Sequence, residues 1–210
     1  MTKPFPYKLY LVISEEACCG RDMLWVAEQA VKGGVDLVQI REKNKSYPDF
    51  LESSLRLKEM LDRYRVPLIV NDNPLVAVNC NAYGVHVGNS DVPPSEIKKK
   101  WPDCNMTGYS VEYLEQLTGN EIQYADYLGV SPVFSTPTKT DTVTEWGLEG
   151  IAKIKSITDK PLVAIGGINE TNTQEIIQAG ANCLAVVSAI CAAEKPAMAA
   201  QALRNLIETA

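Results

Sequence analysis

One segment alternates an amide and two cations in a way that could bind an anion. Gln39, Arg41 and Lys43 are two residues apart, so in an extended strand their side chains lie on one face. Two cations and an amide that converge form a clamp for an oxyanion or a phosphate. The alternative is a surface ion pair with Glu42 and Glu52. We favour the clamp because Gln39 would otherwise point a polar side chain into a core.

Two aspartates follow neighbouring apolar runs. Asp72 comes directly after the run that ends at Asn71, and Asp91 follows Gly88 by three residues. Mg²⁺ is typically held by one or two carboxylates together with substrate phosphates and water. Taken singly, Asp72 could equally begin a turn before Pro74, and Asp91 could equally cap the helix near Pro93-Pro94. As a pair beside a cationic clamp, Asp72 and Asp91 predict a Mg²⁺ site, with Mg²⁺ as the cofactor.

Glycines and a serine near the end of the chain predict a second anion site. Gly166-Gly167 ends one apolar run, and Val187-Ser188 ends the next. Glycine lets the backbone approach a phosphate closely, and Ser188 adds a hydroxyl donor. Two further candidates are less specific. We expect His86 to be a hydrogen-bonded core or rim residue, and Ser110 is either a ligand hydroxyl or an N-cap.

The elements that must position these side chains alternate in type through the whole chain. Strands are expected at Leu9–Ile13, Leu37–Ile40, Leu68–Asn71, Val85–Val87, Met106–Tyr109, Tyr127–Val130, Leu162–Ile165 and Leu184–Val187. Helices are expected at Met23–Lys32, Tyr47–Tyr64, Pro74–Asn79, Pro94–Trp101, Val111–Thr118, Gly147–Ser156, Thr171–Gln178 and Ala197–Glu208. A weak repeat of a small residue with Asp or Asn precedes three strands, at Asp36, Asp126 and Asn182, and suits a tight helix-to-strand turn.

Eight βα units predict the α/β class and a closed (β/α)₈ TIM barrel, as one domain over residues 1–210. An open doubly wound sheet is the alternative, but Ser14–Ala17 is not the glycine-rich turn that it would want. Active sites of such barrels lie at the carboxyl ends of the strands, and phosphate often binds in the last two loops. The polar stretch 131–145 is long for this fold, so we expect a lid or binding loop there.

Composition limits the partners of the chain. Its 20 Lys+Arg against 26 Asp+Glu give a net charge of −6, which disfavours general nucleic-acid binding. The six cysteines form no CxxC pattern, no signal peptide is recognisable, and no apolar stretch is long enough for a bilayer. We expect a soluble cytoplasmic protein with small-molecule substrates, no nucleic-acid or membrane partner, and an oligomeric state left open, a homo-oligomer included.

The ordered set of motifs resembles the thiamine phosphate synthase family over nearly the whole chain. The motifs are Gln39-Ile-Arg-Glu-Lys43, Asn71-Asp72, Gly84-Val-His-Val-Gly88 with Asp91, Gly108-Tyr-Ser110, Thr136-Pro-Thr-Lys139, Gly166-Gly167 and Val187-Ser188. The resemblance implies a (β/α)₈ barrel that joins hydroxymethylpyrimidine diphosphate to a thiazole phosphate and requires magnesium. Thiamine phosphate and diphosphate are released, and a carboxylated thiazole also loses CO₂.

The resemblance also implies roles for individual residues. Arg41, Lys43 and Lys139 would be catalytic, and Asp72 and Asp91 would hold Mg²⁺. The substrate-binding set would be Gln39, Ile40, Arg41, Glu42, Lys43, Asn71, Ser110, Thr136, Pro137, Thr138, Lys139, Gly167, Val187 and Ser188. Departures from the family pattern stand at Asn73, Asn89 and Ser131, none of which is a direct ligand in the family.

Two other functions remain open. A thiazole tautomerase of the same family would share the fold, but that branch tends to lack the loop lysine and the second metal aspartate. It also carries a histidine shortly after the fifth strand, where this chain has Ser110-Val-Glu-Tyr113. A non-catalytic barrel that binds thiamine intermediates would have no reason to keep both carboxylates.

Overall fold

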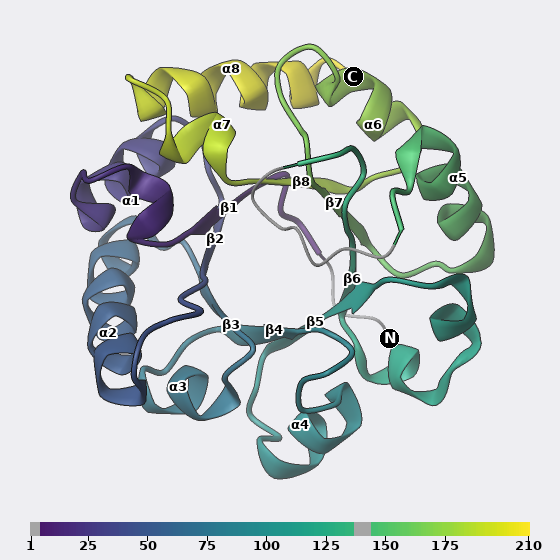
Figure 1. Cartoon of the computed structure of the whole chain (residues 1–210), viewed down its shortest axis with the longest axis horizontal. Coiled ribbons are helices and arrows are strands. Elements are labelled where there is room, and N and C mark those ends of the chain that lie inside the picture. Colours follow the sequence, from purple (N-terminus) through teal and green to yellow (C-terminus); the bar gives the residue numbers. More distant parts are fainter. Residues whose placement is uncertain (1–4, 137–143) are drawn as a thin grey trace.

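Eight parallel strands close into a barrel in chain order, as expected from the alternating pattern (Figure 1). The computed structural model describes residues 5–136 and 144–210. The strands are β1 (Leu9–Ile13), β2 (Leu37–Ile40), β3 (Leu68–Asn71), β4 (Gly84–Val87), β5 (Met106–Val111), β6 (Tyr127–Val130), β7 (Leu162–Ile165) and β8 (Cys183–Val186). Strand β1 pairs with both β2 and β8, so the sheet has no free edge.

The helices form an outer ring around the barrel (Figure 1). They are α1 (Met23–Lys32), α2 (Tyr47–Tyr64), α3 (Pro74–Asn79), α4 (Pro94–Lys100), α5 (Gly147–Ile157), α6 (Thr173–Gln178), α7 (Ser188–Cys191) and α8 (Pro196–Glu208). The described residues also form the 3₁₀ helices η1 (Glu16–Cys18), η2 (Leu114–Thr118) and η3 (Asn120–Tyr124). Local signals begin several of these helices. Asp22, Ser46 and Asn73 each accept a backbone N–H as the N-cap of α1, α2 and α3.

The helix expected at Val111–Thr118 is wrong. Strand β5 continues to Val111, because Ser110 and Val111 pair with Gly129 and Val130 of β6. The Val111 side chain is buried between the sheet and the helices, so tertiary packing outweighs the local helical pattern. The crossover from β5 to β6 then uses the two 3₁₀ helices η2 and η3. The four-residue helix α7 was also not expected, because so short a segment has no readable periodicity.

Side chains alternate between two cores along each strand. Val38 and Ile40 of β2 belong to the outer core between sheet and helices, as expected from the period of two. The inner core fills the barrel itself, with Tyr10, Val12, Leu37, Ile69, Met106, Tyr127, Val163, Cys183 and Ala185. The two fully buried tyrosines make this interior partly polar.

The repeated Asp or Asn before three strands has a structural role that the turn hypothesis did not include. Asp36, before β2, accepts the backbone N–H of Leu9 in β1 at 3.1 Å. Asp126, before β6, accepts the N–H of Thr107 in β5 at 2.7 Å, and Asn182, before β8, accepts that of Leu162 in β7 at 2.9 Å. Each side chain thus ties the start of its strand to the preceding strand at the amino end of the barrel.

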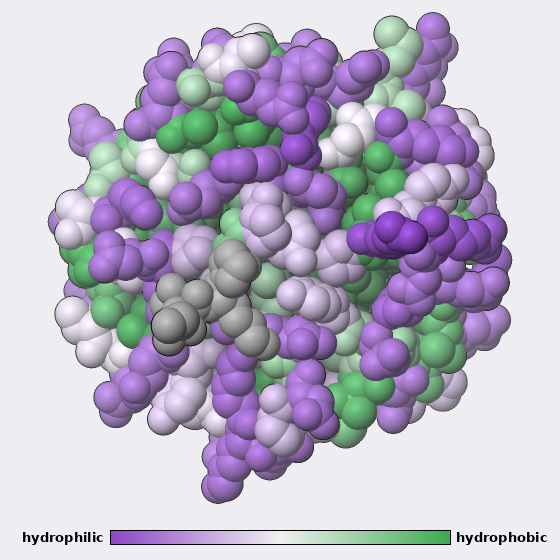
Figure 2. Space-filling view, turned by 180° about the vertical axis from the view of Figure 1, so that it is seen from behind, coloured by the Kyte–Doolittle hydropathy of each residue, from purple (hydrophilic) through white to green (hydrophobic). Residues whose placement is uncertain are grey.

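Polar side chains dominate one face of the molecule (Figure 2). Seen from behind, the ring is mostly hydrophilic, with smaller hydrophobic patches between the polar side chains (Figure 2). Within residues 5–136 and 144–210, no helix combines the length and the apolar composition that a bilayer span requires.

Candidate functional site

Two adjoining cavities lie at the carboxyl ends of the strands. The larger, of about 330 Å³, lies over β7 and β8 and the loops that follow them. The smaller, of about 120 Å³, reaches into the barrel interior and is lined by residues from all eight strands. Both are lined by Val12, Arg41, Ser131, Ile165 and Ala185, so they form one continuous site with Arg41 at its junction.

The structure places the predicted clamp in this site. Arg41 and Lys43 follow β2, and both line the smaller cavity with Gln39. Lys43 Nζ lies 2.5 Å from Asp72 Oδ2, so the clamp and the predicted metal ligands are in direct contact. Gln39 is deeper and only 4% exposed. Its Nε2 donates to Tyr10 Oη at 2.7 Å, so the barrel interior does satisfy this amide, contrary to the argument made from sequence.

Asp72 adopts an unusual backbone conformation at the end of β3. Its φ is 59°, in the left-handed region that non-glycine residues seldom enter, although Asp does so more readily than most. The N–H of Asp72 donates to His86 O at 2.8 Å, and this bond to β4 holds the turn in place. A strained residue of this kind is often found at functional sites, because the surrounding structure must compensate for it.

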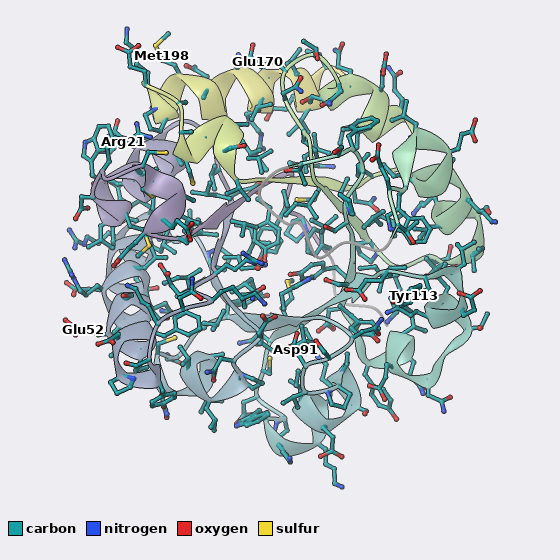
Figure 3. All side chains as sticks on the ribbon, viewed as in Figure 1. Arg21, Glu52, Asp91, Tyr113, Glu170 and Met198 are labelled. Carbon is teal, nitrogen blue, oxygen red and sulfur yellow. The ribbon has the colours of Figure 1, made fainter. Side chains whose placement is uncertain are left out.

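Asp91 lies beside Asp72 at the end of the neighbouring strand. Figure 3 shows it on the inner side of the ring, between β4 and α4. Its Oδ2 accepts the N–H of Gly88 at 2.7 Å, and α4 begins after Pro93 without a side-chain cap, so Asp91 is not the helix cap considered above. Partial burial raises the pKa of Asp91, and the Asp72 carboxylate raises it further, while the Gly88 N–H and Lys43 oppose the shift. Two converging carboxylates of this kind attract a cation.

The remaining polar groups of the smaller cavity come from β3, β4 and β5. Asn71 is nearly buried and lines the cavity. Ser110 lies inside β5, so the N-cap alternative for it is wrong; its Oγ is 2.9 Å from His86 Nε2. His86 Nδ1 is 3.0 Å from Tyr127 Oη, which confirms the expected hydrogen-bonded histidine.

The predicted second anion site forms one wall of the larger cavity. Gly166 and Gly167 have φ of 106° and 67°, which favour glycine. A Cβ on Gly166 would come within 2.6 Å of Pro132 Cβ, and one on Gly167 within 2.8 Å of Phe134 Cβ, so the start of the β6–α5 loop packs directly on them. Opposite, Ser188 begins α7, whose first N–H groups have no acceptor within the helix. This wall can therefore offer backbone and hydroxyl donors to an anion.

Some predicted residues lie elsewhere or outside the described part. The Ile40 side chain is buried in the outer core, so only its backbone faces the barrel rim. Glu42 Oε1 accepts the N–H of Glu15 at 2.8 Å and fixes the loop after β1. Thr136 lines the larger cavity. Pro137, Thr138 and Lys139 lie outside the described residues, as does the rest of 137–143 within the expected lid.

Sequence reasoning missed a second layer of polar residues. Tyr10 and Tyr127 connect Gln39 to His86 across the barrel, although nothing in their local sequence marks them as functional. Asn89 Oδ1 accepts from Tyr109 Oη at 2.6 Å and from Gln116 Nε2 at 2.9 Å, which orders the loops after β4 and β5. The small residues Gly108 and Gly129, on adjacent strands, were the available signal that large groups meet there.

Comparisons with known proteins agree along almost the entire chain. The sequence model of one family, thiamine monophosphate synthase, matches residues 9–190. A thiamine-phosphate synthase of Albidiferax ferrireducens is 48% identical over 201 residues, which cover 96% of this chain and 92% of that protein. That of Shouchella clausii is 40% identical over 98% of each chain. Among solved structures, thiamine phosphate pyrophosphorylase from Pyrococcus furiosus superposes with a TM-score of 0.87 at 32% identity, covering 97% of this chain and 96% of that one.

Proposed function

The chain belongs to the thiamine monophosphate synthase family, and from this premise we propose how its site joins a pyrimidine to a thiazole phosphate with release of diphosphate. The proposed substrates are hydroxymethylpyrimidine diphosphate and a thiazole phosphate, and the products are thiamine phosphate and diphosphate. The observation that carries this proposal is the continuity of the two cavities. An acidic and cationic cluster lies in one, a glycine-rich anion wall lies in the other, and Arg41 stands at their junction.

The pyrimidine diphosphate would occupy the smaller cavity. Arg41 and Lys43 would bind the diphosphate oxygens by charge-assisted hydrogen bonds, which are stronger than neutral ones. Gln39, Asn71 and Ser110 would contact the pyrimidine from the barrel interior. Lys139 would add a further cation from the β6–α5 loop.

Mg²⁺ fits the residues at the end of β3 and β4. Asp72 and Asp91 supply the hard carboxylate oxygens that this ion prefers. The pKa of Asp91 is raised first by its partial burial and then by the neighbouring Asp72 carboxylate. Within the described residues no group of three or more His, Cys, Asp or Glu could hold a metal, so substrate oxygens would complete the coordination. When bound, Mg²⁺ would neutralise charge on the diphosphate. Lys43, which pairs with Asp72, would bind the same diphosphate.

The thiazole phosphate would bind in the larger cavity. Gly167, Val187 and Ser188 would offer backbone N–H groups and one hydroxyl, and Thr136 would add a second hydroxyl from the facing loop. The thiazole ring would then lie between the two anion sites. Its nitrogen would face the methylene carbon of the pyrimidine.

The reaction needs little proton transfer from the protein. The C–O bond between the pyrimidine methylene and the diphosphate breaks, and its electron pair leaves with the diphosphate. The resulting pyrimidine cation is stabilised by resonance, and the thiazole nitrogen then forms the new C–N bond with its lone pair. The protein's main contribution is to stabilise the charge that develops on the leaving group. The single histidine is hydrogen-bonded inside the barrel, in keeping with this division of work.

A product assay with both substrates tests the proposal. Purified protein is mixed with the pyrimidine diphosphate and the thiazole phosphate, and thiamine phosphate and diphosphate are measured together, with Mg²⁺ and with a chelator. We expect equal amounts of the two products, with Mg²⁺ only. Isomerisation of a thiazole without release of diphosphate would instead identify a tautomerase. Binding of either compound without turnover would identify a non-catalytic barrel.

A further inference from the structure

A continuous row of hydrogen bonds crosses the barrel interior beneath the smaller cavity. Gln39 Nε2 donates to Tyr10 Oη at 2.7 Å, and Tyr10 Oη lies 3.0 Å from Tyr127 Oη. Tyr127 Oη is 3.0 Å from His86 Nδ1, and His86 Nε2 is 2.9 Å from Ser110 Oγ. The row joins β2, β1, β6, β4 and β5, so it forms only when the barrel closes.

The neighbouring backbone leaves space for this row. A Cβ on Gly108 would lie 2.2 Å from Tyr127 Cζ and 2.3 Å from His86 Nδ1. A Cβ on Gly129 would lie 2.9 Å from His86 Cε1. Gly108 is on β5, between the strands of His86 and Tyr127, and Gly129 is on β6 with Tyr127. The phenol and the imidazole stack with ring centroids 5.5 Å apart. Their relative position is therefore set by packing as well as by hydrogen bonds.

The direction of the protons in the row follows from its first bond. Because Tyr10 Oη accepts from Gln39, its own hydrogen has Tyr127 Oη as its acceptor. The hydrogen of Tyr127 then points to His86 Nδ1, and the neutral imidazole carries its proton on Nε2. In the reverse order Tyr127 donates to Tyr10, and because Gln39 presents Nε2 to Tyr10, the hydrogen of the buried Tyr10 has no acceptor in the row. An unpaired buried donor is costly, so the first order is favoured.

The tyrosines keep their protons under ordinary conditions. Burial raises the pKa of both Tyr10 and Tyr127 well above that of a phenol in water. Both side chains therefore remain neutral donors, and the row does not lose its direction at neutral or mildly alkaline pH.

We propose that Tyr127 is a positioning residue, which fixes the Nε2–H tautomer of His86 so that Ser110 accepts from the imidazole and donates its own hydroxyl hydrogen into the cavity. At the other end of the row, Gln39 uses Nε2 inside the barrel and keeps Oε1 as an acceptor. The barrel floor then presents one acceptor and one donor on opposite sides. An aminopyrimidine, with an amino donor and a ring-nitrogen acceptor, matches that pair. The tautomer follows from the protein alone, whereas the role of Ser110 toward substrate rests on the proposed function.

Nuclear magnetic resonance can read the tautomer directly, because His86 is the one histidine of the sequence. Protein labelled with ¹⁵N histidine gives a single pair of ring nitrogens, and protonated and unprotonated nitrogens resonate in separate ranges. We expect the wild-type protein to show the Nε2–H tautomer without substrate. Tyr127→Phe removes the donor to Nδ1, so a mixture of tautomers is expected. Tyr10→Phe leaves that donor in place and is expected to keep Nε2–H.

Activity provides the second readout. Tyr127→Phe and Ser110→Ala are each expected to lower kcat/KM for the pyrimidine diphosphate by about tenfold, as for one lost hydrogen bond. Since both changes act on the Ser110 hydroxyl as a donor, the kcat/KM of the double variant should be close to that of Ser110→Ala alone. Tyr7→Phe is the matched control, because its hydroxyl meets Tyr83 in the same inner core but is outside the row. It should change neither readout.

Three outcomes would overturn the proposal. They are an Nδ1–H tautomer in the wild-type protein, an unchanged tautomer in Tyr127→Phe with the same melting temperature, and independent effects of Tyr127→Phe and Ser110→Ala. If the tautomer behaves as expected but no thiamine phosphate forms in the wild-type assay, the proposed substrates are wrong and the positioning of His86 stands.

Discussion

Aspartates at the two ends of the barrel have opposite surroundings. At the amino end, Asp36 accepts backbone N–H groups of Lys8 and Leu9 and also binds Arg204 at 2.6 Å. At the carboxyl end, Asp91 receives one backbone N–H and faces Asp72. The same residue type is thus satisfied by the protein at one end and under-compensated at the other.

Asp126 shows that the amino-end arrangement recurs. It accepts the N–H of Thr107 at 2.7 Å and binds Lys98 at 2.7 Å. These carboxylates join a strand to its predecessor and to a helix, so their contribution is to the fold. The carboxyl-end pair leaves oxygen ligands directed at a cavity, so its contribution is to a ligand. The difference shows that the partners of a carboxylate, and not its residue type, determine whether it stabilises the barrel or binds a ligand.

Removing the carboxyl-end charge should give the largest effect. We expect Asp91→Ala to lower synthase activity by about a hundredfold or more, because the under-compensated oxygens would hold Mg²⁺. The melting temperature should be nearly unchanged, since Asp91 lies at a partly exposed rim. Activity is measured as thiamine phosphate formation over a range of Mg²⁺ concentrations.

The control for this prediction is Asp91→Asn. The amide keeps an acceptor for the Gly88 N–H but loses the charge, so activity should remain almost as low as in Asp91→Ala. Full activity in either variant would show that Asp91 is not a metal ligand.

Removing the amino-end charge should affect stability instead. Asp36→Ala leaves two backbone N–H groups without their side-chain acceptor and removes one of the partners of Arg204, so we expect a loss of about 2 kcal/mol in the free energy of unfolding. Chemical denaturation measures this loss. The kcat of the folded fraction should match that of the wild type. A change in kcat with unchanged stability would show that Asp36 contributes to activity and not to the fold.

An added charge can test the second anion site. Ser188→Asp places a carboxylate at the start of α7, where it would repel a phosphate at close range. We expect the KM for the thiazole phosphate to rise by about tenfold, with little change in the KM for the pyrimidine diphosphate. Ser188→Asn is the uncharged control. A selective effect on the pyrimidine diphosphate would mean that the two sites are exchanged.

The smallest effect is expected at Asn182, the uncharged residue among the three side chains at the amino end of the barrel, which are Asp36, Asp126 and Asn182. Asn182→Ala removes one acceptor, for the N–H of Leu162, so we expect a loss of about 1 kcal/mol in the free energy of unfolding and unchanged kinetics. Comparison of Asn182→Ala with Asp36→Ala by denaturation then measures how much the second backbone N–H and Arg204 together add at Asp36. Equal losses would mean that neither of them contributes there.

Local patterns predicted most of the barrel because its elements are regular and short. The expected bounds of β1, β2, β3, β6 and β7 agree with the structure, as do those of α1, α2 and α3. The errors occur where a distant partner decides. The residues that follow Val111 have a helix-like sequence pattern, but Val111 itself pairs with Val130 of β6. That pairing extends β5 into the region where a helix was expected.

The candidate site was predictable only in part, for the same reason. Arg41, Lys43, Asp72 and Asp91 follow strands, and strand ends in a parallel barrel share one rim, so their grouping could be foreseen. The polar row could not. Tyr10 and Tyr127 are 117 residues apart, and their contact depends on how the closed barrel staggers its strands.

By itself, the sequence determined the alternation of strands and helices, the number of units, and the face on which Gln39, Arg41 and Lys43 lie. These follow from side-chain periodicity, which is a property of short segments. Only the tertiary structure decided that Asp72 adopts φ of 59° beside Asp91, that Gln39 is bonded within the barrel, and that His86 lies between Tyr127 and Ser110. Those arrangements depend on barrel closure, because each one joins groups from different strands whose separation no local pattern encodes.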